Sequence, residues 1–352
     1  MSMKLLFVIV ILFCGFGYGN AQTIKGIVCD KDTKEPIPYV YVYLDGTSVN
    51  TLTDTLGRFK LETKSMINTK LVLLQVAYET YIIDQPFKEL PDTLFLAEKV
   101  TSLGEVEVAA SGKPAPFTRE QKMRAFREQF LGMTNAGKSC TIMNEDDIHL
   151  SFDTKSKRLL ATADVPIEVI NNYLGYKILF TLMDFWAEYS FVSLDDYYLR
   201  MSFFSTASSF IDLDINSKKL KQRRDEIYKN SSKFFFKSFT NNSLRKDGFA
   251  VYNKNRKFEL NKYFEIIDTL SQKEIIIRPN TDINKYQDFF NEEAKAVFSV
   301  FNRVGQESGI FFMTDSLFVD RYGNIDYKGR VLFTGQMSEN KAGDMLPIDY
   351  EP

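Results

Sequence analysis

The stretch "GTSVNTLTDTLGRFKL", residues 46–61, combines a tight-turn signal with an alternating apolar strand. Asp54 is placed where an Asx side chain accepts a backbone N–H across a turn. Gly57 supplies the positive φ that other residues resist, and Phe59 and Leu61 then follow at the two-residue period of a strand. The stretch therefore predicts a corner of a β-sandwich rather than a catalytic loop.

Short strand patterns separated by turn signals continue over residues 22–98. They are "TIKGIVCD", "YVYVYLDG", "TKLVLLQVAYETYII" and "DTLFLAEKV". Helical periodicity is almost absent, and strands at this spacing are typical of a small antiparallel sandwich. The chain also contains 31 Phe and 18 Tyr, an aromatic enrichment that favours strands.

This part of the chain resembles the carboxypeptidase-D-regulatory-like domain, a transthyretin-like β-sandwich. The residues that carry the resemblance are Ile24, Gly26, Val28, Glu35, Pro36, Ile37, Pro38, Gly46, Thr47, Thr53, Asp54, Gly57, Phe59 and Leu61. In true carboxypeptidases the domain accompanies a separate zinc domain, and the sequence contains no counterpart of that zinc domain. The resemblance therefore implies the sandwich without its peptidase chemistry.

The remainder of the chain is also similar to a known group. The segments "REQKMRAFREQFLG", "NNYLGYKI", "RRDEIYKNSSKFFFKSF" and "LPIDYEP" resemble Gram-negative envelope proteins called carboxypeptidase-like regulatory domain-containing proteins. The resemblance implies export and an accessory role at the envelope. The same module begins many TonB-dependent outer-membrane receptors, but the residues that follow here are too few for a plug and a large barrel.

Residues 1–21 have the pattern of a signal peptide. Lys4 precedes the apolar run "LLFVIVILF", and the small residues Gly19 and Ala21 predict cleavage before Gln22. The run is short for a membrane-spanning helix, although an uncleaved anchor is an open alternative. Cys14 lacks the preceding small residue of a lipoprotein signal. We expect an exported protein of the periplasm or the outer membrane.

Residues 99–117 predict a short strand and a linker, stiffened by Pro114 and Pro116. A helix should begin at Thr118, which forms a capping box with Gln121, and end at Gly132. Residues 118–352 then read as a strand-rich α+β domain. They include one basic-to-aromatic helix over residues 216–242 and a hairpin turn at "RYGN", residues 321–324. The predicted fold class is mainly β.

The composition describes a packed protein without a nucleic-acid partner. Hydrophobic residues make up 44% and charged residues 26%, as in globular proteins, and the net charge of −2 gives no basic field. The basic run "KKLKQRR", residues 218–224, could form a peripheral membrane contact, although such runs are usually a solvated helix face. The aromatic run "FFFKSF", residues 234–239, predicts core.

The candidates for nucleophilic or metal chemistry are few. His149 is the single histidine and lies in a strand pattern, so a zinc peptidase ligand set is lacking. No Gly-x-Ser-x-Gly elbow is present to position a serine. Cys29 and Cys140 are expected to be unpaired buried thiols, although an oxidising compartment would allow a disulfide.

Two acidic clusters, "NEDD" at residues 144–147 and "LDD" at residues 194–196, offer Asp146 and Asp195 as glycosidase-like carboxylates. Solvated turn residues are the alternative reading. "DLDIN", residues 212–216, lacks the glycine and distant glutamate of a calcium loop. A phosphate-binding glycine loop is also missing. We therefore predict no catalytic, cofactor-binding or metal-binding residues.

The function predicted from the sequence is an exported, non-enzymatic binding or assembly protein of the bacterial cell envelope. Its expected partner is an envelope protein or glycan. One alternative is a hydrolase of glycans or peptides that uses acidic residues. Another is a membrane-surface accessory to an outer-membrane transport system.

Overall fold

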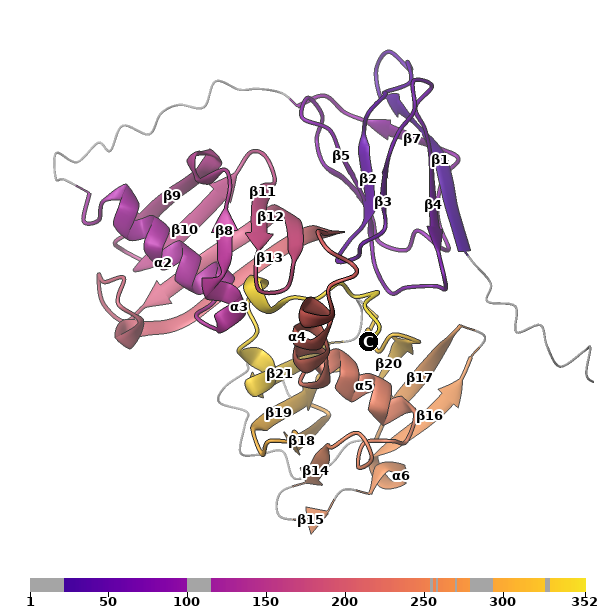
Figure 1. Ribbon diagram of the computed structural model, residues 1–352, viewed down its shortest axis with the longest axis vertical. Coiled ribbons are helices and arrows are strands. Elements are labelled where there is room, and N and C mark those ends of the chain that lie inside the picture. The colour runs from indigo at the N-terminus through magenta and orange to yellow at the C-terminus, as the bar shows by residue number, and fades with distance from the viewer. Residues whose placement is uncertain are drawn as a thin grey trace, which may run out of the picture.

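The computed structural model describes residues 22–99, 115–253, 256–257, 259–269, 271–278, 294–326 and 330–352. These residues form three units, which we call the sandwich unit (residues 22–99), the middle unit (115–212) and the C-terminal unit (213–352) (Figure 1). The predicted signal peptide and residues 100–114 of the predicted linker lie outside the described residues.

The sandwich unit contains two small sheets that share one core. The first, in the order β4–β1–β7, consists of β4 (Arg58–Thr63), β1 (Gln22–Asp30) and β7 (Thr93–Leu96). The second, in the order β3–β2–β5–β6, consists of β3 (Asn50–Leu52), β2 (Tyr41–Leu44), β5 (Leu71–Leu74) and β6 (Tyr81–Ile83). The predicted sandwich is confirmed, except that β1 and β7 run parallel where an antiparallel arrangement was expected.

The turn that precedes β4 has the predicted chemistry. The Asp54 carboxylate accepts the backbone N–H groups of Leu56 and Arg58 at 2.9 and 2.8 Å. Gly57 has a φ of 69°, and an added Cβ would lie 2.4 Å from the carbonyl oxygen of Val28. Only glycine therefore fits this position without displacing β1.

The middle unit packs helices on one face of a six-stranded sheet (Figure 1). Its strands are β8 (Cys140–Ile142), β9 (Ile148–Asp153), β10 (Arg158–Ala163), β11 (Ile167–Asn171), β12 (Tyr176–Tyr189) and β13 (Leu199–Asp212). Its helices are α2 (Arg119–Leu131), α3 (Asn135–Lys138) and the short 3₁₀ turns η1 (Glu145–Asp147) and η2 (Asp196–Tyr198). The order is β8–β11–β12–β10–β9, with β13 paired along the other side of β12.

Helix α2 agrees with the sequence prediction in both termini. Thr118 is its N-cap, the capping box with Gln121 is formed, and Gly132 is its C-cap. Its apolar face is anchored by Phe126 and Phe130, which contact β12 through Phe185 and Phe180 at ring-centroid distances of 4.8 and 5.2 Å. The helix therefore covers the inner face of the sheet and leaves the opposite face uncovered by α2.

The C-terminal unit has two sheets around a phenylalanine-rich core. The five-stranded sheet orders β15 (Arg256–Lys257), β14 (Ala250–Asn253), β18 (Ala296–Phe301), β19 (Glu307–Phe312) and β21 (Val331–Gly335). The three-stranded sheet orders β16 (Phe264–Asp268), β17 (Gln272–Ile277) and β20 (Ser316–Asp320). The helical elements are α4 (Lys218–Lys229), α5 (Ser232–Thr240), α6 (Leu260–Tyr263), η3 (Gln336–Ser338) and η4 (Ala342–Asp344).

Two predictions for this unit need correction. The single helix expected over residues 216–242 is divided into α4 and α5, because Asn230 ends the first and the Ser231 side chain caps the second. The turn at residues 321–324 is present, but β21 pairs with β19 in the other sheet instead of returning along β20. The predicted core run is confirmed, with Phe235, Phe236 and Phe239 all buried.

Candidate functional site

The loop of residues 45–48, where the stretch 46–61 begins, joins the sandwich unit to the middle unit. The backbone N–H of Gly46 donates to the carbonyl of Ser208 at 2.7 Å, and that of Phe210 donates to the carbonyl of Thr47 at 2.9 Å. The Asp45 carboxylate accepts the Ser208 N–H at 2.7 Å. Residues 45–47 thereby add a short parallel segment to the edge of β13.

The C-terminal segment closes this junction from the other side. The N–H of Ile348 donates to the carbonyl of Gly46 at 2.7 Å. Ser48 donates its backbone N–H and its hydroxyl to the two carboxylate oxygens of Asp349, at 3.1 and 2.8 Å. Residues from the sandwich unit and both later units therefore meet at one place in the molecule.

Lys233 of α5 holds the last residues of the chain against this junction. Its ammonium donates to the carbonyl oxygens of Ile348 and Tyr350 at 2.7 and 2.8 Å. Burial lowers the pKa of Lys233 to about 8, while the neighbouring carboxylates of Asp320 and Asp349 oppose that shift. At neutral pH the side chain keeps its proton, and it acts as a hydrogen-bond donor to the tail.

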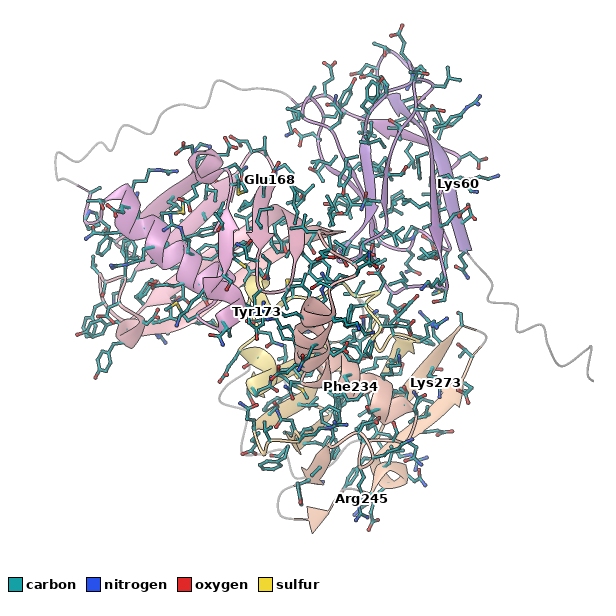
Figure 2. All side chains as sticks on the ribbon, viewed as in Figure 1. Lys60, Glu168, Tyr173, Phe234, Arg245 and Lys273 are labelled. Carbon is teal, nitrogen blue, oxygen red and sulfur yellow. The ribbon has the colours of Figure 1, made fainter. Side chains whose placement is uncertain are left out.

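The basic run at residues 218–224 does not present a uniform face. Arg224 is 5% exposed, binds both carboxylate oxygens of Asp212 at 2.6 and 2.9 Å, and lies 3.9 Å from the ring centroid of Tyr176. Arg223 lies over the ring of Tyr173, which Figure 2 shows beside α4. The lysines of the run are exposed on the outer side of the helix: Lys218, Lys219 and Lys221. A membrane contact would therefore rest on lysines alone.

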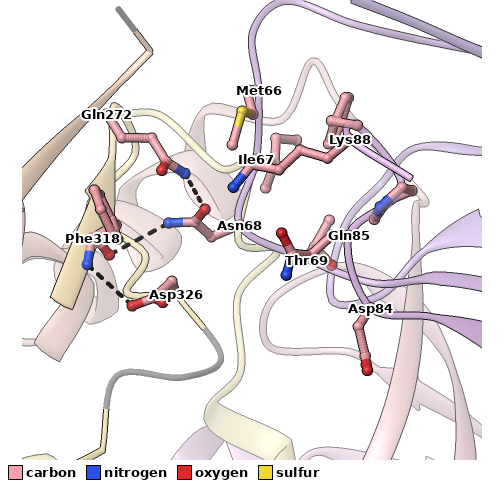
Figure 3. Close-up of a pocket in the computed structure, with 12 residues that line it drawn as sticks. Met66, Ile67, Asn68, Thr69, Asp84, Gln85, Lys88, Gln272, Phe318 and Asp326 are labelled. Atoms are coloured by element: carbon pink, nitrogen blue, oxygen red, sulfur yellow. Dashed lines mark hydrogen bonds between the residues drawn. The ribbon is translucent and has the colours of Figure 1, made fainter. Parts of the chain in front are cut away.

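A cavity of about 460 Å³ borders the junction and is lined by all three units, with Ser48, Tyr176 and Asp349 in its wall. Another cavity, of about 140 Å³, lies between the sandwich unit and the sheet of β17 and β20. Figure 3 shows Asn68 at its wall, bonded to Gln272 and to the carbonyl of Phe318. These bonds join the sandwich unit to the C-terminal unit.

The face of the middle sheet opposite α2 carries an exposed apolar row. Leu160, Trp186 and Phe203 lie opposite one another on β10, β12 and β13. The rings of Trp186 and Phe203 are stacked, with centroids 5.8 Å apart, and the guanidinium of Arg158 lies 4.6 Å from the Trp186 ring. Phe203 is 45% exposed and Met201, two residues along β13, is 57% exposed. Aromatic and methionine side chains in such contact are typical of interaction surfaces.

The two candidate carboxylates are not brought together. Asp146 precedes β9, is fully exposed and lies 4.0 Å from Arg119. Asp195 is the N-cap of η2, in the connection between β12 and β13. Asp146 therefore lies beside Arg119, whereas the Asp195 carboxylate accepts the hydrogen bond that caps η2, and no hydrogen bond or ion pair among the described residues places the two carboxylates side by side as a glycosidase pair would need.

The other candidates have ordinary surroundings. His149 is exposed on β9 and lies 3.2 Å from the Asp164 carboxylate. Asp212 of the calcium-like segment is the partner of Arg224. Cys29 and Cys140 are both free thiols, and burial raises the pKa of Cys140 to about 12. Within the described residues, no group of three His, Cys, Asp or Glu side chains is arranged to hold a metal ion.

The sequence reasoning missed β13, the strand on which the junction and the apolar row both depend. "LRMSFFSTASSFID" has no strict alternation, and Ser and Thr dilute its apolar pattern. Its register with β12 shifts twice, near residues 182–184 and 188–189, which disturbs the period of two. The usable signal was the absence of a charged residue from 201 to 211.

The first unit defines the class of module to which this part of the chain belongs. Two small sheets packed around one core, with an Asx-Gly corner, make a β-sandwich of the regulatory type. Residues 24–108 match the model of the CarboxypepD_reg-like domain, so this segment is a CarboxypepD_reg-like domain. A comparison with curated proteins finds none that matches the chain. Among the described residues, no helix has both the length and the apolar character needed to cross a membrane.

Proposed function

We propose that the protein is an exported, non-enzymatic binding or assembly protein of the bacterial cell envelope, and that its partner is another protein. The CarboxypepD_reg-like domain supports this proposal, because the module is typical of envelope proteins that bind or assist transport. The N-terminal pattern of Lys4, an apolar run and a small-residue cleavage site supports export.

The observation that carries the proposal is the exposed row of Leu160, Trp186 and Phe203. A surface that presents a tryptophan and a phenylalanine in contact has a large apolar area to bury, and such residues dominate the energy of protein interfaces. The row lies on a long strand pair that also holds the sandwich unit. A partner bound there would contact a surface whose position is determined by the whole molecule.

The experiment is crosslinking with mass spectrometry in fractionated cells that express the full chain. A photoreactive residue replaces Phe203, and the matched control carries it at Phe95, a strand residue of the sandwich unit with similar exposure. We expect the protein in the envelope fraction and a reproducible protein adduct from position 203. A protein retained in the cytosol, or the same unspecific neighbours from both positions, would contradict the proposal.

A further inference from the structure

Over residues 200–206, no strand of the described part of the chain pairs with the outer edge of β13, which we call the open edge. β12 pairs with β13 along almost its entire length, from Tyr189 opposite Leu199 to Tyr176 opposite Asp212. On the other side of β13, no backbone hydrogen bond joins residues 200–206 to any part of the chain that the structure describes. Unpaired N–H and C=O groups on such an edge are a template for a further strand.

The same edge already accepts a strand-like segment a few residues further on. Thr47 forms a parallel bridge with Ser209, and main-chain bonds from Gly46 and Phe210 flank it. This added segment ends at the point where the open part of the edge begins. A second segment that bound residues 200–206 would continue an interface that the molecule already uses.

The side chains beside the open edge determine what a further strand should carry. Leu160, Trp186 and Phe203 form one row across three neighbouring strands. A residue placed next to Phe203 would extend the row, and apolar or aromatic pairs are favoured at such positions. Open main-chain groups and an apolar row at the same place meet both requirements of strand addition, affinity and side-chain selection.

The neighbouring row adds a charge preference. Arg158 and Arg200 both bind the carboxylate of Glu188, at 2.6 and 3.0 Å, and Glu188 lies opposite Met201. Asp153 lies opposite Arg158 on the far side of the row, so two guanidinium groups face two carboxylates, and Arg200, on β13 itself, is the charged group nearest to the open edge. A strand added beside β13 would place an acidic residue here, two positions from the residue next to Phe203.

We propose that an extended segment of a partner protein adds to the open edge of β13 as a further strand. Its side chain beside Phe203 is apolar, and its side chain beside Arg200 is acidic. This inference rests on the proposed function and names the chemistry of the partner. The occupant is another protein because an extended polypeptide supplies main-chain partners for this edge, as residues 45–47 already do further along it, together with an apolar side chain for the row and a carboxylate for Arg200.

The probe is a fluorescently labelled synthetic peptide, TETFTVT, with blocked ends, added to the purified full-length protein. Its glutamate, phenylalanine and valine share one face of a strand. Added parallel to β13, as residues 45–47 are, it places the glutamate toward Arg200 when the phenylalanine lies beside Phe203. We expect saturable binding by fluorescence anisotropy. The control peptide TETFPVT replaces the threonine after the phenylalanine with proline, which removes one N–H from the ladder. We expect it to bind at least about tenfold more weakly, since an edge that pairs through the backbone depends on such donors.

Two protein variants locate the site. Phe203→Ala should weaken binding of TETFTVT about tenfold, since hot-spot aromatic residues carry energies of this order. Phe95→Ala, the matched control on the sandwich unit, should leave binding unchanged. Arg200→Glu should weaken TETFTVT and strengthen the charge-swapped peptide TKTFTVT. Circular dichroism and the thermal midpoint verify that each variant is folded.

The inference is overturned if both peptides bind Phe203→Ala as they bind the unmodified protein, or if the proline peptide binds as well as TETFTVT. It is also overturned if light scattering shows a dimer that dissociates in the Phe203→Ala variant, since the occupant would then be a second copy. If the peptide does not bind but the crosslinked partner in cells is retained, the assignment of the β13 edge is wrong and the proposed function stands. Loss of the crosslinked partner removes the proposed function itself.

Discussion

The sandwich unit and the middle unit both form stable sheets, but their strands differ in length and in how their polar groups are paired. The strands of the sandwich unit span three to nine residues and are joined by turns whose polar groups are satisfied locally. The middle unit is built on β12 and β13, each of 14 residues, and a segment from another unit pairs with one part of its edge. Short strands with local turns define a module, whereas long strands create surfaces that other chain segments can use.

The bonding of two carboxylates shows the same contrast. Asp54 is satisfied within four residues, by the N–H groups of Leu56 and Arg58. Asp212 depends on Arg224, which also donates to the carbonyl of Leu174, fifty residues earlier. A change at Asp54 should therefore act within its turn, while a change at Arg224 should loosen several elements at once.

The largest effect is expected from Arg224→Leu. The substitution leaves the Asp212 carboxylate without its cation and removes the donors to two carbonyl groups. Breaking one side of a buried pair costs about 3–5 kcal/mol. Urea unfolding followed by circular dichroism should show a loss of this size. Lys221→Leu, an exposed position on the same helix, is the control and should change the free energy by less than about 0.5 kcal/mol. Equal losses of free energy of unfolding in the two variants would mean that the Arg224–Asp212 pair does not stabilise the fold.

The corresponding test of the sandwich unit is Gly57→Ala. An added Cβ would lie 2.4 Å from the Val28 carbonyl in a residue with a φ of 69°. The left-handed backbone and the overpacking together should cost about 3 kcal/mol. Gly305→Ala is the matched control, because its φ is 80° but nothing lies within 4 Å of the added Cβ. We expect about 1 kcal/mol there, and a Gly57 variant no worse than this control would disprove the close-approach argument.

The junction between the units should respond to pH through Lys233. Its pKa is lowered to about 8 from the ordinary value of 10.5, so between these values the unfolded chain binds more protons. Stability contributed by this group should therefore rise with pH across that window, by about 1.4 kcal/mol per pH unit. Over pH 8.5 to 10 the difference between the protein and its Lys233→Met variant should grow by about 2 kcal/mol. A constant difference would show that burial does not control this ammonium.

The smallest effect is expected at the start of α2. Thr118→Ala removes the N-cap acceptor of the Gln121 N–H and the reciprocal box, which should cost about 1 kcal/mol. Thr118→Ser keeps the hydroxyl and is the matched control. Thermal unfolding measures both variants, and a serine variant as unstable as the alanine variant would point to a lost packing contact instead of a lost cap.

The predictable parts of the fold are those with local causes. The Asp54-Gly57 corner, the capped helix α2 and the buried phenylalanines of α5 all follow from neighbours within a few residues. The break between α4 and α5 was also local, but the Asn230-Ser231 cap was overlooked inside a longer helical pattern. The pairing of β21 could not be predicted from the sequence, since a turn at residues 321–324 does not specify which sheet the next strand joins.

The candidate site was less predictable than the fold. Asp146 and Asp195 were plausible as a pair only while their places in the sheet were unknown. Trp186 and Phe203 lie 17 residues apart, and only the register of β12 with β13 makes them neighbours. Arg224 was one residue of a basic run in the sequence, and its burial depends on Asp212 and on the ring of Tyr176.

By itself, the sequence determined the sandwich module and its corner at residues 46–61. These properties follow from side chains that act on their own backbone or on the next strand. Only the tertiary structure decided that Asp45, Gly46 and Thr47 of this corner dock on β13, and that the rest of the β13 edge stays open in the part of the chain described. The physical reason is that main-chain donors and acceptors have no sequence signature, so their partners depend on which strands the folded chain brings together.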